Sequence, residues 1–311
     1  MASVEVKRLS AQIKAKALDL GFDLIGFVPS RKLAEQEEHL HLWLEKKMNA
    51  DMSYLSGKIK ERLNPELLFP GAKSVIVAGM NYFPPVLQGG DGVPVISKYA
   101  YGEDYHIVLK EKLKNLLDHI VSVDGSASGK ICVDSSPVLE KAWAHEAGLG
   151  WIGKNSLLLN IKYGSFVFLG EIILNLELDY VDSRPDDNCG NCDLCVRSCP
   201  TGAINNDRTI DAAKCISWLT VENKDDIPEE YRTKINNRIF GCDICQDVCP
   251  WNKNLSPHNN FRFSLNEEVK NMSFAEWKSM DHNKFERLFS NSPLKRRGYA
   301  KIIRNIEFVT G

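Results

Sequence analysis

Apolar residues recur every three to four positions in several segments of the chain, which is the spacing of one face of an α-helix. Gly21 follows the first segment and suits a helix C-cap, whereas Asp104 suits the N-cap of the third. Pro137 would occupy the first turn of the fourth, where a proline is tolerated. The pattern therefore predicts helices over residues 4–20, 34–47, 105–120 and 137–147.

Four mainly apolar segments outside these helices predict strands, and residues 74–80 form a continuous apolar run with the length of a buried strand. The four segments cover residues 22–28, 74–80, 130–133 and 166–178, the last as one long strand or two short ones. Asp134 directly follows the third segment and so lies at the end of that strand. A Gly-rich stretch over 89–94 is expected to be a mobile loop. Strands that alternate with helices indicate a mixed α/β domain.

Eight of the nine cysteines lie between residues 189 and 249, in two sets that each end before a proline. The first set is Cys189, Cys192, Cys195 and Cys199, and the second is Cys215, Cys242, Cys245 and Cys249. The first has the C-x2-C-x2-C-x3-C spacing of bacterial ferredoxins, in which the fourth cysteine binds the other cluster. Crossed pairing would give one [4Fe–4S] cluster to Cys189, Cys192, Cys195 and Cys249, and the other to Cys199, Cys215, Cys242 and Cys245.

Structural zinc and disulfide bonds are the two alternative uses of these cysteines. Zinc sites also contain C-x2-C pairs, but they take two pairs for each metal rather than three cysteines in a row and a distant fourth. Disulfide frameworks belong to oxidising compartments and to small domains with a poor core. We therefore favour two cubane clusters, with zinc as the main alternative.

The length of 311 residues and the ordinary apolar fraction suit a soluble globular protein with one large and one smaller domain. We predict an α+β protein with an N-terminal mixed α/β domain over residues 1–181, a ferredoxin-like two-cluster iron–sulfur domain over 182–254, and a short helical C-terminal tail over 255–311. Neither a signal peptide nor a membrane span is expected, and the reduced cysteines indicate the cytoplasm. The net charge of −2 gives no overall attraction to nucleic acid, so such binding would need a local basic patch.

Several short motifs together resemble the epoxyqueuosine reductase family. They are Asp104-Tyr105-His106, Val133-Asp134, Ala147-Gly148 with Gly150, Lys154-Asn155, Tyr163-Gly164-Ser165, Cys215-Ile216-Ser217, the segment 232–241, and both cysteine sets. The resemblance implies reduction of the epoxide of epoxyqueuosine to queuosine at the wobble position of tRNA. It also implies cobalamin and two [4Fe–4S] clusters as cofactors. We further expect an unidentified low-potential electron donor and a monomer. Cobalamin itself follows from the resemblance alone.

The resemblance also implies which residues contact cobalamin and which one supplies the proton. The cobalamin contacts would be Arg62, Ser97, Asp134, Asn155, Leu158, Ser217, Cys242 and Asp243. Asp134 would be the general acid, provided that burial raises its pKa enough to keep a proton near neutral pH. The alternative role for Asp134 is a cap for the helix expected near Pro137. His106 would either assist Asp134 and the substrate or serve as an ordinary structural histidine.

Two groups of basic residues are candidates for phosphate contacts with tRNA. One group is Arg232, Lys234 and Arg238, and the other is Lys295, Arg296 and Arg297. Such runs more often form a solvated surface. Two other functions stay open: a corrinoid reductive dehalogenase, which would share both cofactor types, and an electron carrier without an active site of its own. A carrier would have no need of Asp134 at the end of a strand.

Overall fold

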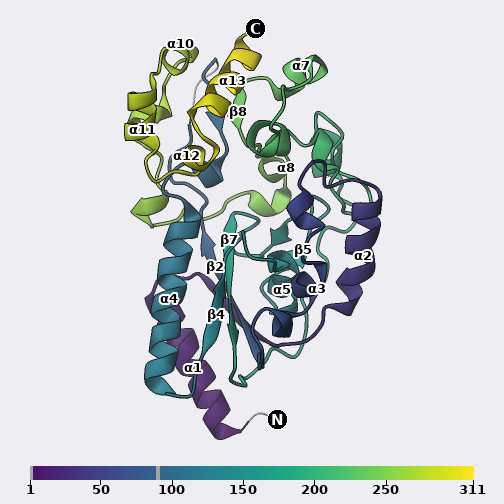
Figure 1. Ribbon diagram of the computed structural model, residues 1–311, viewed down its shortest axis with the longest axis vertical. Coiled ribbons are helices and arrows are strands. Elements are labelled where there is room, and N and C mark those ends of the chain that lie inside the picture. The colour runs from purple at the N-terminus through teal and green to yellow at the C-terminus, as the bar shows by residue number, and fades with distance from the viewer. Residues whose placement is uncertain (1–2, 89–91) are drawn as a thin grey trace.

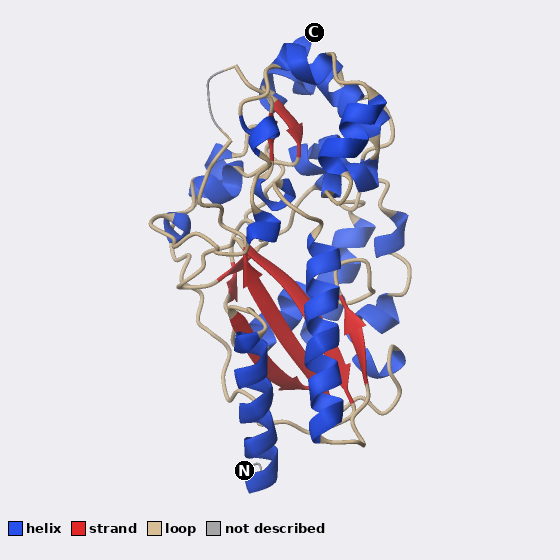
Figure 2. Ribbon diagram, turned by 90° about the vertical axis from the view of Figure 1, so that its left-hand side faces the viewer, coloured by secondary structure: helices blue, strands red, loops and turns tan. Residues whose placement is uncertain are grey.

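A four-stranded antiparallel sheet forms the centre of the lower half of the molecule in the computed structural model, which describes residues 3–88 and 92–311 (Figures 1 and 2). Its strand order is β1 (Leu24–Pro29), β2 (Ser74–Asn81), β7 (Val167–Leu174) and β4 (Gly129–Cys132). All eight residues of β2 are buried, which fits its uninterrupted apolar sequence. The four predicted strands are confirmed, and the run over 166–178 forms one strand rather than two.

Helices cover both faces of this sheet. On one face, α1 (Val4–Asp19) and α4 (Tyr105–Val123) lie side by side, and their buried side chains pack on β2 and β7 (Figure 1). On the other face, α5 (Glu140–Glu146) packs against the same two strands, with α2 (Ala34–Glu45) and α3 (Ile59–Leu63) outside it. The sheet is therefore a buried platform whose strand ends can present side chains to a cavity.

The helix ends follow the expected chemistry with one exception. Gly21 adopts a φ of 86° after α1, where a residue with a Cβ would be strained, and the Asp104 carboxylate accepts the His106 N–H at the start of α4. The fourth helix, however, begins at Glu140 rather than in the turn of Pro137. Its start is delayed because the chain leaves β4 through a loop in which Asp134 adopts a left-handed φ of 47°.

The cysteine-rich segment and the C-terminal helices form the upper half of the molecule (Figure 1). Its short elements are β3 (Val95–Ile96), α6 (Leu194–Ser198), α7 (Arg232–Ile235), β8 (Arg238–Phe240) and α8 (Ile244–Asp247). The short strands β5 (Trp151–Ile152) and β6 (Leu158–Leu159) pair with each other beside α5. The C-terminal helices are α9 (Glu267–Lys270), α10 (Phe274–Lys278), α11 (His282–Phe289), α12 (Pro293–Arg297) and α13 (Tyr299–Thr310). The expected helical tail is thus confirmed in its secondary structure.

Helix α13 is tied into the frame of the cysteine segment. Asn305 is wholly buried and donates to the carbonyl oxygens of Thr220, at 2.7 Å, and Ile239, at 2.8 Å. These two carbonyls belong to the segments that follow Cys215 and precede Cys242. The C-terminal helices therefore help to fix the spacing of two cysteine-bearing segments. The division of the chain into three domains stays a prediction.

Residues 89–91 of the predicted 89–94 loop lie outside the described residues. Within the described part of the chain, no helix is both long and apolar enough to cross a membrane.

Candidate active site

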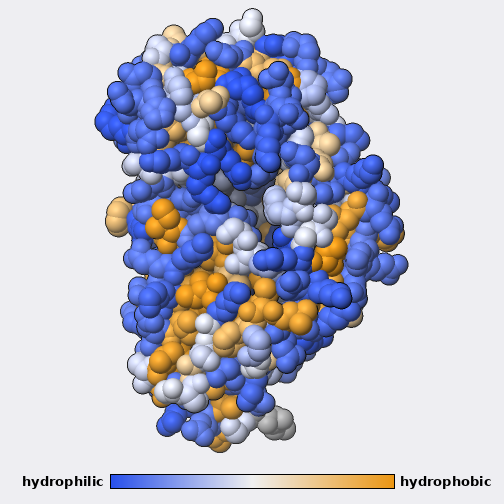
Figure 3. Space-filling model, viewed as in Figure 1, coloured by the Kyte–Doolittle hydropathy of each residue, from blue (hydrophilic) through white to orange (hydrophobic). Residues whose placement is uncertain are grey.

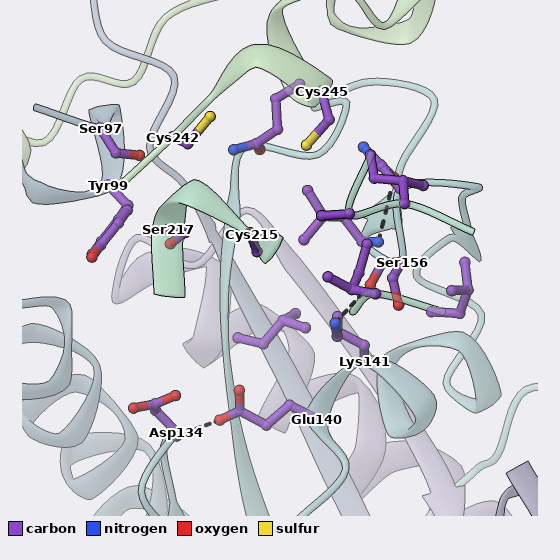
Figure 4. A pocket seen from close by; sticks show the side chains of 18 of the residues that line it. Ser97, Tyr99, Asp134, Glu140, Lys141, Ser156, Cys215, Ser217, Cys242 and Cys245 are labelled. Carbon is purple, nitrogen blue, oxygen red and sulfur yellow. Dashed lines mark hydrogen bonds between the residues drawn. The ribbon is translucent and has the colours of Figure 1, made fainter. Parts of the chain in front are cut away.

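A cavity of about 800 Å³ lies between one end of the sheet and the cysteine segment, and Figure 4 looks into it. The molecular surface is hollowed near the middle of the face drawn in Figure 3. Asp134 and Glu140 come from the β4–α5 connection, whereas Cys215, Ser217 and Cys242 come from the opposite wall. The two walls are far apart in the sequence, so the cavity depends on how both halves pack together.

Most of the residues predicted to contact cobalamin line this cavity. They are Arg62, Ser97, Asp134, Asn155, Ser217 and Cys242. Leu158 and Asp243 do not line it: Leu158 packs in the core beside α5, and Asp243 accepts hydrogen bonds from Ser97 and from the Lys98 N–H. Asp243 thus supports Ser97 from behind. The assignment of these eight residues to cobalamin stays a prediction.

Two buried donors in the cavity wall suit a bound group that is rich in acceptors. The Nδ2 of Asn155 and the Nε of Arg62 are buried, and neither has a hydrogen-bond partner among the described residues. A buried donor without an acceptor is costly, so such atoms commonly mark the place of a ligand or an ordered water. The mostly apolar wall with a few directed polar atoms fits a large planar macrocycle with amide side chains.

The eight cysteines divide between two cavities. Cys199, Cys215, Cys242 and Cys245 line the 800 Å³ cavity, whereas a separate space of about 40 Å³ is lined by Cys189, Cys192, Cys195 and Cys249. This is the grouping that crossed pairing requires. Cys249, from the second set, joins the first three cysteines of the first set, and Cys199, from the first set, joins the remaining cysteines of the second. The arrangement supports the predicted ligand sets, which stay a prediction. It also puts one set of four cysteines directly on the large cavity.

Asp134 belongs to a chain of hydrogen-bonding groups with His106 and Asp104. His106 Nδ1 lies 2.6 Å from Asp104 Oδ1, and His106 Nε2 lies 2.7 Å from Asp134 Oδ2. Both nitrogens carry a proton when each faces a carboxylate, so the geometry favours the imidazolium form. Burial lowers the pKa of His106, but the bonds to both aspartates and their charges raise it above its ordinary value.

In the protein alone, the pKa of Asp134 lies below its ordinary value. Burial raises it, but the hydrogen bond and charge of His106, together with Arg296 and Arg297, outweigh burial and bring it below its ordinary value. The Asp134 side chain is also half exposed to the cavity, which limits the desolvation. In the protein alone, the carboxylate form of Asp134 and the protonated form of His106 are therefore favoured. The raised pKa expected for Asp134 when it is buried against a corrin stays a prediction.

The alternative role of Asp134 as a helix cap also fails. Helix α5 begins at Glu140, its N-cap residue is Leu139, and that cap has no side-chain hydrogen bond. The Asp134 carboxylate instead contacts His106.

Glu140 and Lys141 are cavity residues that the sequence did not reveal. Glu140 accepts the backbone N–H of Asp134, and Lys141 Nζ donates to the carbonyl oxygen of Ser156 at 2.6 Å (Figure 4). Burial, and then the charge of Asp134, raises the pKa of Glu140 to about 7. Glu140 is the first residue of α5 and belongs to no recognisable sequence motif, so only the three-dimensional arrangement identifies it.

A second space of about 350 Å³ adjoins the large cavity and shares Asp134 and Tyr105 with it. Arg296 and Arg297 line this space, and Arg296 Nη1 lies against the His106 ring, 2.7 Å from Nδ1. Because both ring nitrogens already face carboxylates, we treat this approach as a charge contact with the network rather than as a hydrogen bond to the ring.

The other predicted phosphate contacts lie outside both spaces. Lys295 pairs with Glu286 at 2.7 Å, and Arg232 pairs with Glu229. Lys234 lies 5.3 Å from the centre of the Tyr231 ring, and Arg238 donates to the carbonyl of Ile235 at 3.3 Å. Contact of any of these residues with tRNA stays a prediction.

Comparisons with known proteins show the family to which the chain belongs. Residues 62–135 match the family model "Epoxyqueuosine reductase QueG, DUF1730", and residues 188–252 match "4Fe-4S double cluster binding domain". An epoxyqueuosine reductase of Leadbetterella byssophila is 46% identical, covering 96% of this chain and 98% of the relative. That of Cellulophaga algicola is 44% identical, covering 96% of both chains.

Solved structures show the same relationship. A crystal structure of epoxyqueuosine reductase with a tRNA-Tyr epoxyqueuosine-modified stem loop superimposes with a TM-score of 0.88 at 31% identity, covering 97% of this chain and 80% of the other. A catabolic reductive dehalogenase shares only the fold, with a TM-score of 0.51 at 17% identity over 80% of this chain and 32% of the other. By full-length identity and by structure, the chain belongs to the epoxyqueuosine reductase family.

Proposed function

We propose that this protein reduces the epoxide of epoxyqueuosine to queuosine at the wobble position of tRNA, using cobalamin and two [4Fe–4S] clusters. The observation that carries the proposal is the position of Asp134. It faces the cavity that four cysteines line, and it is paired with His106. Removal of an epoxide oxygen as water takes two electrons and two protons. The cysteine walls would hold the clusters that carry the electrons, the Asp134–His106 pair would give the first proton, and solvent would give the second.

The double cluster domain delivers electrons one at a time from a low-potential donor. Cobalamin would supply a strongly reducing centre for the two-electron reduction of the epoxide. Arg62 and Asn155 would hold its amide groups, and Ser97 and Ser217 would line its faces. Cys199, Cys215, Cys242 and Cys245 line the same cavity, so the cluster that they would hold is the one beside the corrin.

The proton is stored at His106 Nε2 and reaches the substrate through Asp134. As the epoxide C–O bond breaks, negative charge develops on the leaving oxygen, which can take a proton from the Asp134 carboxyl group. Asp134 Oδ2 takes that proton from His106 Nε2, 2.7 Å away. Asp104 keeps the imidazole ring oriented for this transfer through its contact with Nδ1.

The smaller space beside Asp134 is where we place the modified base and its neighbouring phosphates. Its wall contains Trp43 and Trp218, which offer flat surfaces for stacking, and Arg296 and Arg297, which offer positive charge. A base that leaves the anticodon stack can enter such a space without an intact duplex having to fit. We place the protein in the cytoplasm as a monomer, where its tRNA substrate is found.

The direct test is nucleoside mass spectrometry of tRNA from a strain that lacks this gene. We expect epoxyqueuosine to accumulate, and queuosine to return when the intact gene is supplied. Purified protein with both cofactor types and a chemical reductant should convert epoxyqueuosine-containing tRNA in the same assay. Unchanged queuosine in the deletion strain, or turnover of halogenated aromatics with no action on tRNA, would refute the proposal.

A further inference from the structure

The loop that carries Asp134 has an unusual backbone. It connects β4 to α5 over residues 133–139, and Asp134 itself adopts a left-handed φ of 47°. A residue with a Cβ is uncommon in this region, and such a conformation persists only when its surroundings hold it. The structure must therefore contain a contact that fixes the Asp134 backbone in this state.

That contact is made by Glu140. The Asp134 backbone N–H donates to the Glu140 carboxyl oxygen across the loop (Figure 4). Because Asp134 also bonds to His106 through its side chain, it is held from two directions. The backbone bond sets where the Cα lies, and the His106 bond then sets where the carboxylate points.

Glu140 sits in surroundings that explain its altered titration. The charged groups that face it are Asp134, His106, its neighbour Lys141, and the wholly buried Glu171 of β7. Neither oxygen of Glu171 has a hydrogen-bond partner among the described residues. Burial, followed by the charge of Glu140, holds the pKa of Glu171 well above its ordinary range. The two glutamates therefore retain at least one proton near neutral pH.

We infer that Glu140 is a positioning residue of the reaction: by holding the Asp134 N–H it keeps the Asp134 carboxylate against His106 and facing the substrate. Glu140 itself need not touch the substrate or a cofactor to do this. The inference rests on the proposed function for its effect on turnover. Its structural part, the hold on the Asp134 amide, can be tested without the reaction.

Two substitutions of Glu140 separate positioning from simple packing. Glu140→Leu fills a similar volume but removes the oxygen that accepts the Asp134 N–H. Glu140→Gln keeps an acceptor oxygen but can no longer gain or lose a proton. In cofactor-loaded protein with tRNA, we expect Glu140→Leu to lower kcat about 10- to 100-fold with little change in KM, the size of losing a hydrogen bond to an ionisable group. Glu140→Gln should restore most of kcat and flatten any step in the pH profile near neutral pH.

Amide hydrogen exchange of the 133–139 loop gives a readout that does not depend on turnover. The Asp134 amide should exchange faster in Glu140→Leu than in the parent, and near the parental rate in Glu140→Gln. Glu171→Gln is the matched control, since it changes the buried pair and leaves the Asp134 bond in place. It should alter the pH profile near neutral pH but keep both kcat at its best pH and the exchange rate.

The possible results show whether the positioning role of Glu140 or the proposed reductase function has failed. Parental kcat and parental exchange in Glu140→Leu would overturn the positioning role. If Glu140→Leu does not fold, slow turnover of Glu140→Gln with a parental pH profile would overturn it instead. If the parent protein leaves epoxyqueuosine intact while the exchange results hold, the proposed function fails and the role of Glu140 in the loop stands.

Discussion

His106 Nε2 lies 2.7 Å from Asp134 Oδ2, and this contact makes the two residues one proton-holding unit. The paired charges raise the pKa of His106 and lower that of Asp134. In the free protein the proton therefore resides on the imidazole, which Asp104 supports from the other side. Asp134 is the group that faces the cavity, and His106 is the group that keeps it supplied.

Replacing His106 by Gln should lower turnover and change its pH dependence. Glutamine can bond to Asp134 but cannot supply a proton, so we expect a loss of roughly 10²-fold. The parent should lose activity as pH rises above 6.5, the ordinary pKa of histidine, and through the raised pKa of His106, because the imidazolium proton is lost there. The decline should disappear in His106→Gln.

The same network has a stability signature with a defined sign. The raised pKa of His106 contributes stability that is fully present below the unfolded pKa and is lost as pH rises through the folded value. The lowered pKa of Asp104 contributes stability above its ordinary pKa, lost as pH falls through the folded value. His41→Gln, on the exposed side of α2, is the control for the pH dependence of turnover and for that of stability. Equal pH profiles for His106→Gln and His41→Gln would contradict the account.

Removing Cys199 or Cys249 should damage different clusters. Each variant should retain about four of the roughly eight irons expected for two cubanes. Cys199→Ala should disturb the cluster beside the large cavity, and Cys249→Ala the one in the small space. Electron paramagnetic resonance of the reduced proteins checks this. Loss of the same signal in both variants would show that the crossed pairing is wrong, and zinc in anaerobically prepared parent protein would end the cluster interpretation.

Asn305→Ala should destabilise the protein although the side chain lies far from the reacting groups. It would leave the buried carbonyl oxygens of Thr220 and Ile239 without their donor, at a cost of about 1–3 kcal/mol each. Thermal unfolding and iron retention should both show the loss, because these carbonyls flank two cysteine segments. Asn271→Ala, at an exposed position before α10, is the control and should change neither.

The basic residues near the cavity should affect tRNA binding through salt. Changing Lys295, Arg296 and Arg297 to alanine should weaken affinity and reduce the slope of log affinity against log salt by about 0.7 to 0.9 for each phosphate that is no longer neutralised. Lys7, Arg8 and Lys14, on α1 at the opposite end of the molecule, form a matched control triple (Figure 1). Equal slopes for the two triple variants would make the first group an ordinary solvated surface.

Sequence patterns predicted the elements of the sheet half well because their signals are local. The wholly buried strand β2 and the Asp104 cap need only neighbouring residues to be recognised. The two cysteine groups also follow from spacing, since ferredoxin-type loops dictate which thiols can meet. The start of α5 was missed because Asp134 enters a left-handed conformation that Glu140 holds from six residues away.

The electrostatics of the site could not be predicted in the same way. Burial alone suggested a protonated Asp134, but its pKa depends on His106 and on Arg296, which is 190 residues from His106 in the sequence. Leu158 and Asp243 likewise follow from family resemblance rather than local pattern, and the fold places them behind the cavity wall. Both the pKa of Asp134 and the positions of Leu158 and Asp243 depend on contacts between segments far apart in the sequence, so a local pattern cannot predict them.

Single-turnover conversion of epoxyqueuosine-containing tRNA by Asp134→Asn tests the central claim most directly. Asparagine keeps the shape and can bond to His106, but it cannot pass a proton to the leaving oxygen. With cobalamin and both clusters loaded to the parental level, the account predicts that the rate of queuosine formation falls by about 10²- to 10⁴-fold. A rate close to that of the parent, with both cofactor types fully bound, would contradict it and would assign the proton to another group or to solvent.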